Sequence, residues 1–237
     1  MIHLKNEREI EGLRASADLV GRTLGAVAPA VVPGVSTMEL DQIAETFILN
    51  HGAKPAFKGY RVGREVFPAT LCTSVNDEVV HGIPDNTFLK AGDIVSVDCG
   101  VLLDGFYGDS AFTFAVGAIS EDTQLLLATT YDSLMLATKQ ATTGKRLGDI
   151  GAAIQELCEE RGYGVVKDLV GHGIGRSLHE DPQVPNYGRA GSGRKLKSGL
   201  VICIEPMINR GSAHVRTEGD GWTVKTADSL PSAHYEH

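Results

Sequence analysis

The sequence predicts one α+β domain, residues 1–237, made of two similar α/β halves over approximately 1–120 and 121–237. Two observations indicate the internal repeat. Lys90–Asp98 and Lys197–Glu205 share one pattern: a lysine, a small residue, a glycine, then an apolar run ending in a carboxylate. Each half also places a His-Gly-Ile triplet before that run, at His81–Ile83 and His172–Ile174. Matches in the same order favour a duplicated unit.

Hydrophobic periodicity and capping signals predict the helices and strands of each half. Apolar residues recur at three- and four-residue steps from Ile10 to Val27, which indicates a first helix ending before Pro29. Ser36 and Glu39 form a capping box for a second helix, and Gly52 stands where that helix ends. Further elements are expected as strands over 93–103, 106–116 and the apolar run before Glu205, and as helices over 125–138 and 147–160.

Composition excludes several classes of protein. The chain has 237 residues, of which 42% are hydrophobic and 22% charged, as in globular domains. A net charge of −8 argues against a nucleic-acid-binding surface. No apolar run approaches the ~18 residues of a membrane helix, and the charged N-terminus does not resemble a secretory signal. Four scattered cysteines suggest neither a zinc knuckle nor a disulfide framework. We therefore expect a cytoplasmic protein, and a monomer.

A hairpin that carries two carboxylates is the clearest local feature. Asp104-Gly105 is a two-residue turn signal between apolar strands. Pairing across it sets Gly100 opposite Asp109, so Asp98 and Asp109 become diagonal neighbours on one face. The strands are apolar on both sides, and lysine and arginine are absent from 91–120. Buried charges pair or bind metal, so this pattern favours a metal over a solvated face.

The repeat brings further candidate ligands to the same place. If the halves are symmetric, Glu205 takes the position of Asp98 as a third carboxylate. The Gly-rich segment Gly171–Glu180 is expected to be neither a helix nor a strand, and it holds His172 and His179. Oxygen-rich ligation with one imidazole suits Mn, Fe, Co or Zn.

At these residues the chain resembles the short bacterial type I methionine aminopeptidases over almost its whole length. The motifs that carry the resemblance are Cys72–Asn76, His81–Pro84, Val97–Gly100, Tyr107–Asp109, Gly171–Gly175, Ile204–Met207 and Asp220–Trp222. The resemblance implies the pita-bread fold, in which two pseudo-symmetric α/β halves with antiparallel sheets cradle a dinuclear metal site. It also implies removal of the N-terminal methionine from peptides, and from nascent chains at the ribosome.

The same resemblance implies a ligand set and catalytic roles. The metal ligands would be Asp98, Asp109, His172, Glu205 and Glu236, holding two divalent ions (Co, Mn, Fe or Zn). These ions would polarise the scissile carbonyl and lower the pKa of a bridging water. Glu205 is then the candidate general base. His179 would donate to the carbonyl oxygen, and His81 would contact the substrate amide nitrogen or the leaving group.

A pocket for methionine should be narrow, apolar and partly aromatic. The resemblance points to Phe57, Tyr60, Phe67, Cys72, Leu178 and Trp222, together with His81 and His179. Two alternatives stay open. A proline-specific aminopeptidase or dipeptidase of the same fold shares the ligand pattern, but usually carries an additional N-terminal domain. A non-catalytic pita-bread binding protein would have lost ligands, whereas this sequence keeps them.

The end of the chain carries its own expectation. Glu236 is the pseudo-symmetric partner of Asp109, and related chains continue for several apolar residues beyond this position. We therefore expect that the closing C-terminal strand is missing after His237 and that the last residues are weakly held. The carboxylate of Glu236 should nevertheless lie beside those of Asp109 and Glu205.

Overall fold

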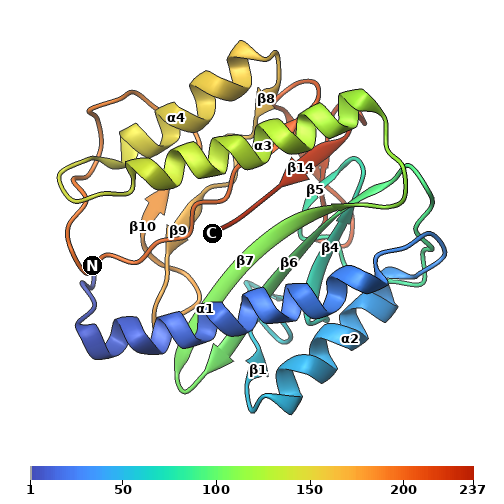
Figure 1. Cartoon of the computed structure of the whole chain (residues 1–237), viewed down its shortest axis with the longest axis horizontal. Helices are drawn as coiled ribbons and strands as arrows, with labels where there is room; N and C mark the ends of the chain where they lie inside the picture. Colours follow the sequence, from blue (N-terminus) through green and yellow to red (C-terminus); the bar gives the residue numbers. More distant parts are fainter. Residues whose placement is uncertain (1) are drawn as a thin grey trace.

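The computed structural model describes residues 2–237. Figure 1 shows two pairs of helices on opposite sides of the molecule, with the long hairpin β6–β7 between them and the C-terminus near the middle. The helices are α1 (Glu7–Val27), α2 (Thr37–Asn50), α3 (Glu121–Gln140) and α4 (Leu147–Glu160), with a short 3₁₀ turn at Ala28–Ala30. Among the described residues, no helix is long and apolar enough to cross a bilayer.

Over residues 2–237 the strands form five antiparallel sheets. In the first half, β6 (Ile94–Leu103) pairs with β7 (Phe106–Ala115) on one side, and with β4 (Leu71–Val75) and β1 (Lys54–Pro55) on the other. In the second half, β11 (Met207–Asn209) lies between β14 (Ser232–His234) and β8 (Gly164–Val165). The smaller sheets are β9 (Gly171–Gly173) with β10 (Glu180–Val184), β13 (Val224–Thr226) with β12 (Val215–Thr217) and β5 (Glu78–Val80), and β2 (Arg61–Val62) with β3 (Glu65–Val66).

The predicted carboxylate hairpin has the expected register. Asp104 and Gly105 both adopt positive φ, 50° and 81°, as a two-residue turn with matching twist requires. Gly100 pairs with Asp109, and Asp98 pairs with Ala111. Asp98 and Asp109 are therefore diagonal neighbours on one face, as the sequence predicted.

Each half builds its own hydrophobic core against its helices. The first cluster joins Leu19 and Val27 of α1 and Leu40 of α2 to Val97 and other residues of the β6 sheet. The second joins residues of α3 and α4 to the β11–β14 sheet, with Leu134, Ile150, Ile208 and Ala233 among its members. The capping box at Ser36 and Glu39 is confirmed. The helix expected over 125–138 is longer, because Ser120 caps it at its N-terminus.

The apolar run before Glu205 differs from the expected strand. Only an isolated bridge, Ile202 with Gly173, forms there, and regular pairing begins at Met207. Pro206 explains the interruption, because it has no N–H to donate to a ladder. The register still continues past it, since Ile204 and His237 exchange both backbone hydrogen bonds at 2.9 and 3.1 Å. Glu205 thus stands opposite Glu236.

The expectation that the last residues are weakly held is wrong. Tyr235 and Glu236 are buried, and the segment lies against the edge of β7. The Glu236 N–H donates to the Ala111 carbonyl at 2.9 Å, and the Tyr235 hydroxyl donates to the Thr113 carbonyl at 3.1 Å. This segment therefore joins the sheet of the second half to β7 of the first.

Close packing of α1 on β7 at Gly108 gives a first prediction. A Cβ at Gly108 on β7 would lie 2.6 Å from the carbonyl carbon of Ser16 on α1. A Cβ at Gly25, which is also on α1, would meet nothing within 4 Å. Gly108→Ala should lower the free energy of unfolding by about 1–3 kcal/mol through overpacking. Gly25→Ala should raise it by about 0.5–1 kcal/mol, because alanine favours the helix. Urea denaturation measures both. Equal effects of the two variants would contradict this account.

Candidate active site

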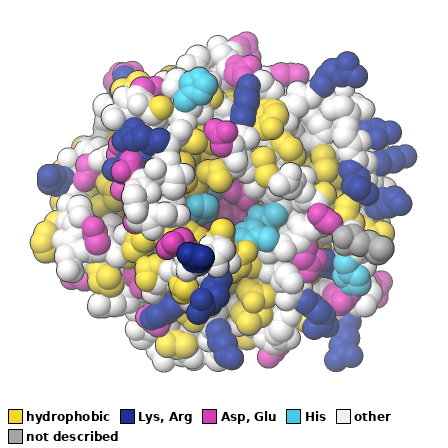
Figure 2. All heavy atoms as spheres, turned by 180° about the vertical axis from the view of Figure 1, so that it is seen from behind, with side chains coloured by type: hydrophobic (Ala, Val, Ile, Leu, Met, Phe, Trp, Pro, Cys, Tyr) yellow, Lys and Arg dark blue, Asp and Glu magenta, His cyan; other side chains and the backbone are white. Residues whose placement is uncertain are grey.

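Five candidate ligands converge where the two halves meet. Asp98 lies on β6 and Asp109 on β7, and both come from the first half. The second half supplies His172 on β9, Glu205 just before β11 and Glu236 just after β14. Figure 2 shows the face opposite to the one in Figure 1. A hollow lies in the middle of it, where histidine and acidic side chains lie deep among hydrophobic ones. The expected convergence of Glu236 with the other acids is present.

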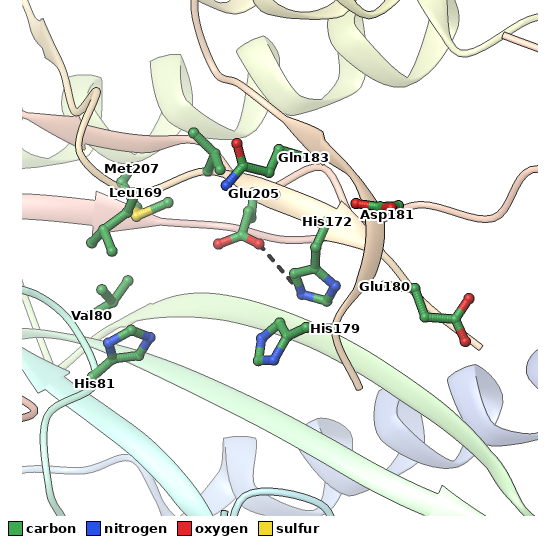
Figure 3. A pocket seen from close by; sticks show the side chains of 12 residues that line it. Val80, His81, Leu169, His172, His179, Glu180, Asp181, Gln183, Glu205 and Met207 are labelled. Atoms are coloured by element: carbon green, nitrogen blue, oxygen red, sulfur yellow. Dashed lines mark ion pairs between the residues drawn. The ribbon is translucent and has the colours of Figure 1, made fainter. Parts of the chain in front are cut away.

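The ring of His172 faces the carboxylates. Its Nε2 lies 3.7 Å from Glu205 Oε1 and 3.9 Å from Asp109 Oδ2, and Figure 3 marks the first pair. Its Nδ1 is 2.8 Å from the Gly173 carbonyl oxygen. A carbonyl only accepts, so Nδ1 carries the hydrogen and Nε2 keeps a free lone pair toward the acids. This tautomer is the one that a metal-ligating imidazole needs.

The segment Gly171–Glu180 was expected to contain no strand, and this is wrong at both ends. Gly171–Gly173 is strand β9, and β10 begins at Glu180. Glycine makes this possible, because a Cβ at Gly171 would collide with the Cys203 carbonyl oxygen and one at Gly173 with that of Asp181. The backbone at Cys203 and the backbone at Asp181 therefore approach β9 more closely than side chains at positions 171 and 173 would allow.

Residues 174–179 remain a loop, and Glu180 holds it in shape. Its Oε1 accepts hydrogen bonds from the backbone N–H groups of Arg176 and Ser177, at 2.9 and 3.2 Å. Its Oε2 pairs with the buried ammonium group of Lys5. The loop that carries His179 is thus fixed to the N-terminal segment of the chain.

Burial raises the pKa of all four carboxylates, and repulsion by neighbouring carboxylates adds to the effect for three of them. Burial raises the pKa of Asp98 to about 7. It also raises the pKa of Asp109, Glu205 and Glu236 well above their usual range, with the neighbouring carboxylates adding to the effect. Without compensating positive charge these groups hold protons, because ionising them together is unfavourable.

The donor set fits divalent cations. Asp98 Oδ1, Asp109 Oδ1 and Glu236 Oε1 are buried without a hydrogen-bond partner among residues 2–237. Within the same described range, no lysine or arginine lines the cavity around them. Buried carboxylate oxygens that no protein group satisfies, beside one imidazole, are ligands of the kind that Mn, Fe, Co and Zn accept.

Two further histidines border the site. Burial lowers the pKa of His81 to about 4, and burial together with the neighbouring His172 and His81 lowers that of His179 to about 4. Both rings are therefore neutral near pH 7. His179 Nδ1 lies 2.6 Å from the Tyr60 hydroxyl, and its ring packs edge-on against His172 at 4.3 Å between centroids. His81 has a φ of 61°, a left-handed conformation that non-glycine residues seldom adopt.

An inner cavity of about 180 Å³ opens on the carboxylates. All six side chains predicted for the pocket line it, namely Phe57, Tyr60, Phe67, Cys72, Leu178 and Trp222. They also pack together as one cluster, with the Phe67 and Trp222 rings perpendicular and 5.2 Å apart. Sequence reasoning missed Val62, which lines the same cavity. It also missed Cys203, whose thiol lies among the candidate ligands.

A larger space of about 440 Å³ adjoins the inner cavity. His81, His172, His179 and Glu205 line both spaces, and Figure 3 shows their side chains facing one another across the opening. The outer space is bounded by polar residues, including Asp181 and Gln183, as well as by Leu169 and Met207. The acids thus lie between a small apolar chamber and a wider groove.

Comparison with known proteins places the chain among metallopeptidases. The model of metallopeptidase family M24 matches residues 11–230. The methionine aminopeptidase of Clostridium perfringens is 53% identical over 237 residues, which is 100% of this chain and 94% of that protein. Methionine aminopeptidase 1 of Bacillus subtilis is 48% identical with the same coverage.

Solved structures agree in fold. The crystal structure of methionine aminopeptidase from Rickettsia prowazekii superposes with a TM-score of 0.97 at 42% identity, covering 100% of this chain and 94% of that one. A prolidase from Pyrococcus horikoshii shares the fold alone, with a TM-score of 0.78 at 22% identity over 98% of this chain and 59% of its own. The chain therefore belongs to metallopeptidase family M24. The expected pita-bread fold and the resemblance to type I methionine aminopeptidases are confirmed.

Metal binding should stabilise the fold measurably. At an Mn²⁺ concentration of about 100 Kd, mass action adds about 2.7 kcal/mol to the free energy of unfolding, so the Tm of the chelator-treated protein should rise. Asp109→Asn should remove most of this rise, because Asp109 is one of the four residues whose ligand atoms lie within 4.8 Å of one another. Asp18→Asn, a matched change on the exposed face of α1, should respond like the unaltered chain. Differential scanning calorimetry with and without Mn²⁺ measures this, and an equal rise in both variants would contradict the site.

Proposed function

We propose that this chain is a metal-dependent methionine aminopeptidase, which hydrolyses the peptide bond after an N-terminal methionine. The observation that carries the proposal is the junction of an apolar, partly aromatic cavity with a buried carboxylate–imidazole cluster. The methionine aminopeptidases that this chain matches over its whole length support the same conclusion. Substrates would be peptides and nascent chains that begin with methionine.

Asp98, Asp109, His172, Glu205 and Glu236 would hold two divalent ions, drawn from Co, Mn, Fe or Zn. The charges support two ions, because four carboxylates balance two divalent cations. Bound there, such ions supply Lewis acidity that polarises a carbonyl and makes water nucleophilic near neutral pH. Every other part of the reaction falls to side chains of the chain itself.

Glu205 is the general base in this proposal. Among residues 2–237, Glu205 is the one acid that lines both the inner cavity and the outer groove. It can therefore take a proton from the attacking water and deliver it to the amine that leaves through the groove. Glu205 remains partly accessible, with 15% of its side chain exposed, whereas Glu236 is buried at 2%.

His179 donates a hydrogen bond to the scissile carbonyl oxygen. Burial raises the pKa of Tyr60, so its hydroxyl keeps its hydrogen and donates to Nδ1 of the neutral His179 ring. The ring hydrogen is then on Nε2, free to stabilise the developing oxyanion. Tyr60 thus sets the tautomer of His179 as well as lining the methionine pocket.

His81 contacts the substrate amide nitrogen or the leaving amine across the opening from His179. Its unusual backbone conformation is held by its neighbours. Gly82 accepts a hydrogen bond from the Thr73 N–H at 2.8 Å and donates one to the Ser74 hydroxyl at 3.2 Å. A Cβ at Gly82 would collide with the Thr73 carbonyl oxygen. The β4 backbone therefore aims the ring of His81 into the shared space.

Two other activities are less well supported. A proline-specific peptidase shares the fold, but the chain spans only 59% of the prolidase structure, at 22% identity. A non-catalytic binding protein of this fold would lack ligands, and here five candidate ligands converge. We place the protein in the cytoplasm, acting on nascent chains at the ribosome, because its substrates are freshly made N-termini. We expect it to act as a monomer.

A peptide panel tests the activity. With Mn²⁺ or Co²⁺ added, the protein should release the first residue from Met-Ala and Met-Gly peptides, and not from Leu-Ala or Pro-Ala. The unbranched thioether side chain should fit the cavity, and a branched side chain should not. Chromatography of the released amino acid measures the reaction, with a chelator as control. Preference for any other first residue would refute the proposal.

Substitution separates the roles of His179 and Tyr60 from metal binding. His179→Ala should lower kcat by about 10²–10³-fold, as loss of one oxyanion donor does. Tyr60→Phe should lower kcat by a smaller factor, because the His179 tautomer is no longer fixed. Tyr187→Phe serves as the control, because Tyr187 lines neither the inner cavity nor the outer groove. Metal content, measured by mass spectrometry, should stay unchanged in all three. Loss of metal in His179→Ala would instead make His179 a ligand.

A further inference from the structure

Cys203 is a buried thiol among the candidate ligands. Its exposure is 3%. One ligand atom from each of Asp109, His172, Cys203 and Glu236 lies within 4.8 Å of the other three. The other cysteines differ in their surroundings: Cys99 and Cys158 lie in the two hydrophobic cores, and Cys72 lies in the cluster that lines the pocket.

The backbone fixes this thiol beside His172. The Cys203 N–H donates to the His172 carbonyl oxygen at 2.7 Å, next to the bridge between Ile202 and Gly173. Cys203 and Glu205 stand on either side of Ile204, which pairs with His237 through two backbone hydrogen bonds. In such an extended segment, side chains two residues apart point to the same side. Cys203 therefore faces the cluster together with Glu205.

Each of the two carboxylates in this cluster keeps one oxygen without a partner. Glu236 Oε1 and Asp109 Oδ1 are buried without a hydrogen bond among the described residues. Exposure is 2% for Glu236 and 5% for the Asp109 side chain. A thiol, an imidazole and two carboxylates that point at one place form a four-donor set. Thiolate and imidazole donors together are typical of zinc sites.

We propose that Cys203 Sγ is a further donor to the ion that His172 holds, so that this metal position favours thiophilic cations. The inference rests on the metal centre of the proposed function and refines its specificity. A soft thiolate ligand favours Zn²⁺, Co²⁺ or Cd²⁺ over Mn²⁺. A site made of carboxylates alone would suit Mn²⁺. The thiol gives up its proton to solvent as the metal–sulfur bond forms, so binding of such a cation releases one proton more than oxygen ligation would.

Cobalt spectroscopy of the metal-free protein tests the bond directly. Titration with Co²⁺, in oxygen-free buffer with a non-thiol reductant, should produce a near-ultraviolet thiolate-to-cobalt charge-transfer band. The band should be absent in Cys203→Ser and Cys203→Ala. It should persist in Cys158→Ala, a matched loss of a buried cysteine in the α4 core. Absence of the band from the unaltered protein, or its survival in both Cys203 variants, would overturn the proposal.

Metal affinities supply the second readout. Isothermal titration should show Cd²⁺ binding weakened by about 10–100-fold in Cys203→Ser, the range seen when supporting groups of a metal site are removed. Mn²⁺ binding should change little. An equal loss for both cations would mean that the thiol only supports Glu236, and would refute ligation. If the unaltered protein binds no divalent cation, the proposed function itself fails; Mn²⁺ binding without a charge-transfer band removes only this inference.

Discussion

Repulsion among four buried carboxylates is the constraint on which the rest of this structure depends. Two unit charges 4 Å apart repel by about 4 kcal/mol at the effective dielectric constant of a protein. Several such pairs would rival the whole stability of a domain, about 5–15 kcal/mol. The first half supplies Asp98 and Asp109, and the second supplies Glu205 and Glu236. The halves can therefore meet stably only when protons or cations occupy the space between their acids.

The backbone makes that meeting rigid by close approach. Gly171 and Gly173 let β9 lie against Cys203 and Asp181. The terminal segment is bonded to Ile204 of its own half through His237, and to Ala111 of the other half through the Glu236 N–H. Each ligand therefore sits on a paired backbone or, as Glu205 does, between two paired residues. A site assembled in this way is preorganised, so little reorganisation is needed when charge enters it.

Local signals in the sequence were sufficient for the first half of the site. The Asp104-Gly105 turn determines its own register, and that register alone makes Asp98 and Asp109 neighbours. The second half depends on longer-range effects that local patterns do not carry. Pro206 interrupts a ladder whose partner lies about thirty residues away, and the glycines around His172 form a strand because of what packs against them. Cys203 was missed because the apolar run around it favours a core residue, and only the fold shows which way its thiol points.

The unequal spaces on either side of the acids determine which end of a substrate is cut. A chamber of about 180 Å³ is close in size to cavities that hold one benzene ring, so it admits one side chain and not a folded segment. The groove beyond it, about 440 Å³, is wider and more polar. His81, His179 and Glu205 stand at the boundary, so with the roles proposed for them the reacting bond lies one residue from the buried end of the substrate. A metallopeptidase with this geometry is an exopeptidase by shape, and the aromatic lining of the chamber then selects the residue that it removes.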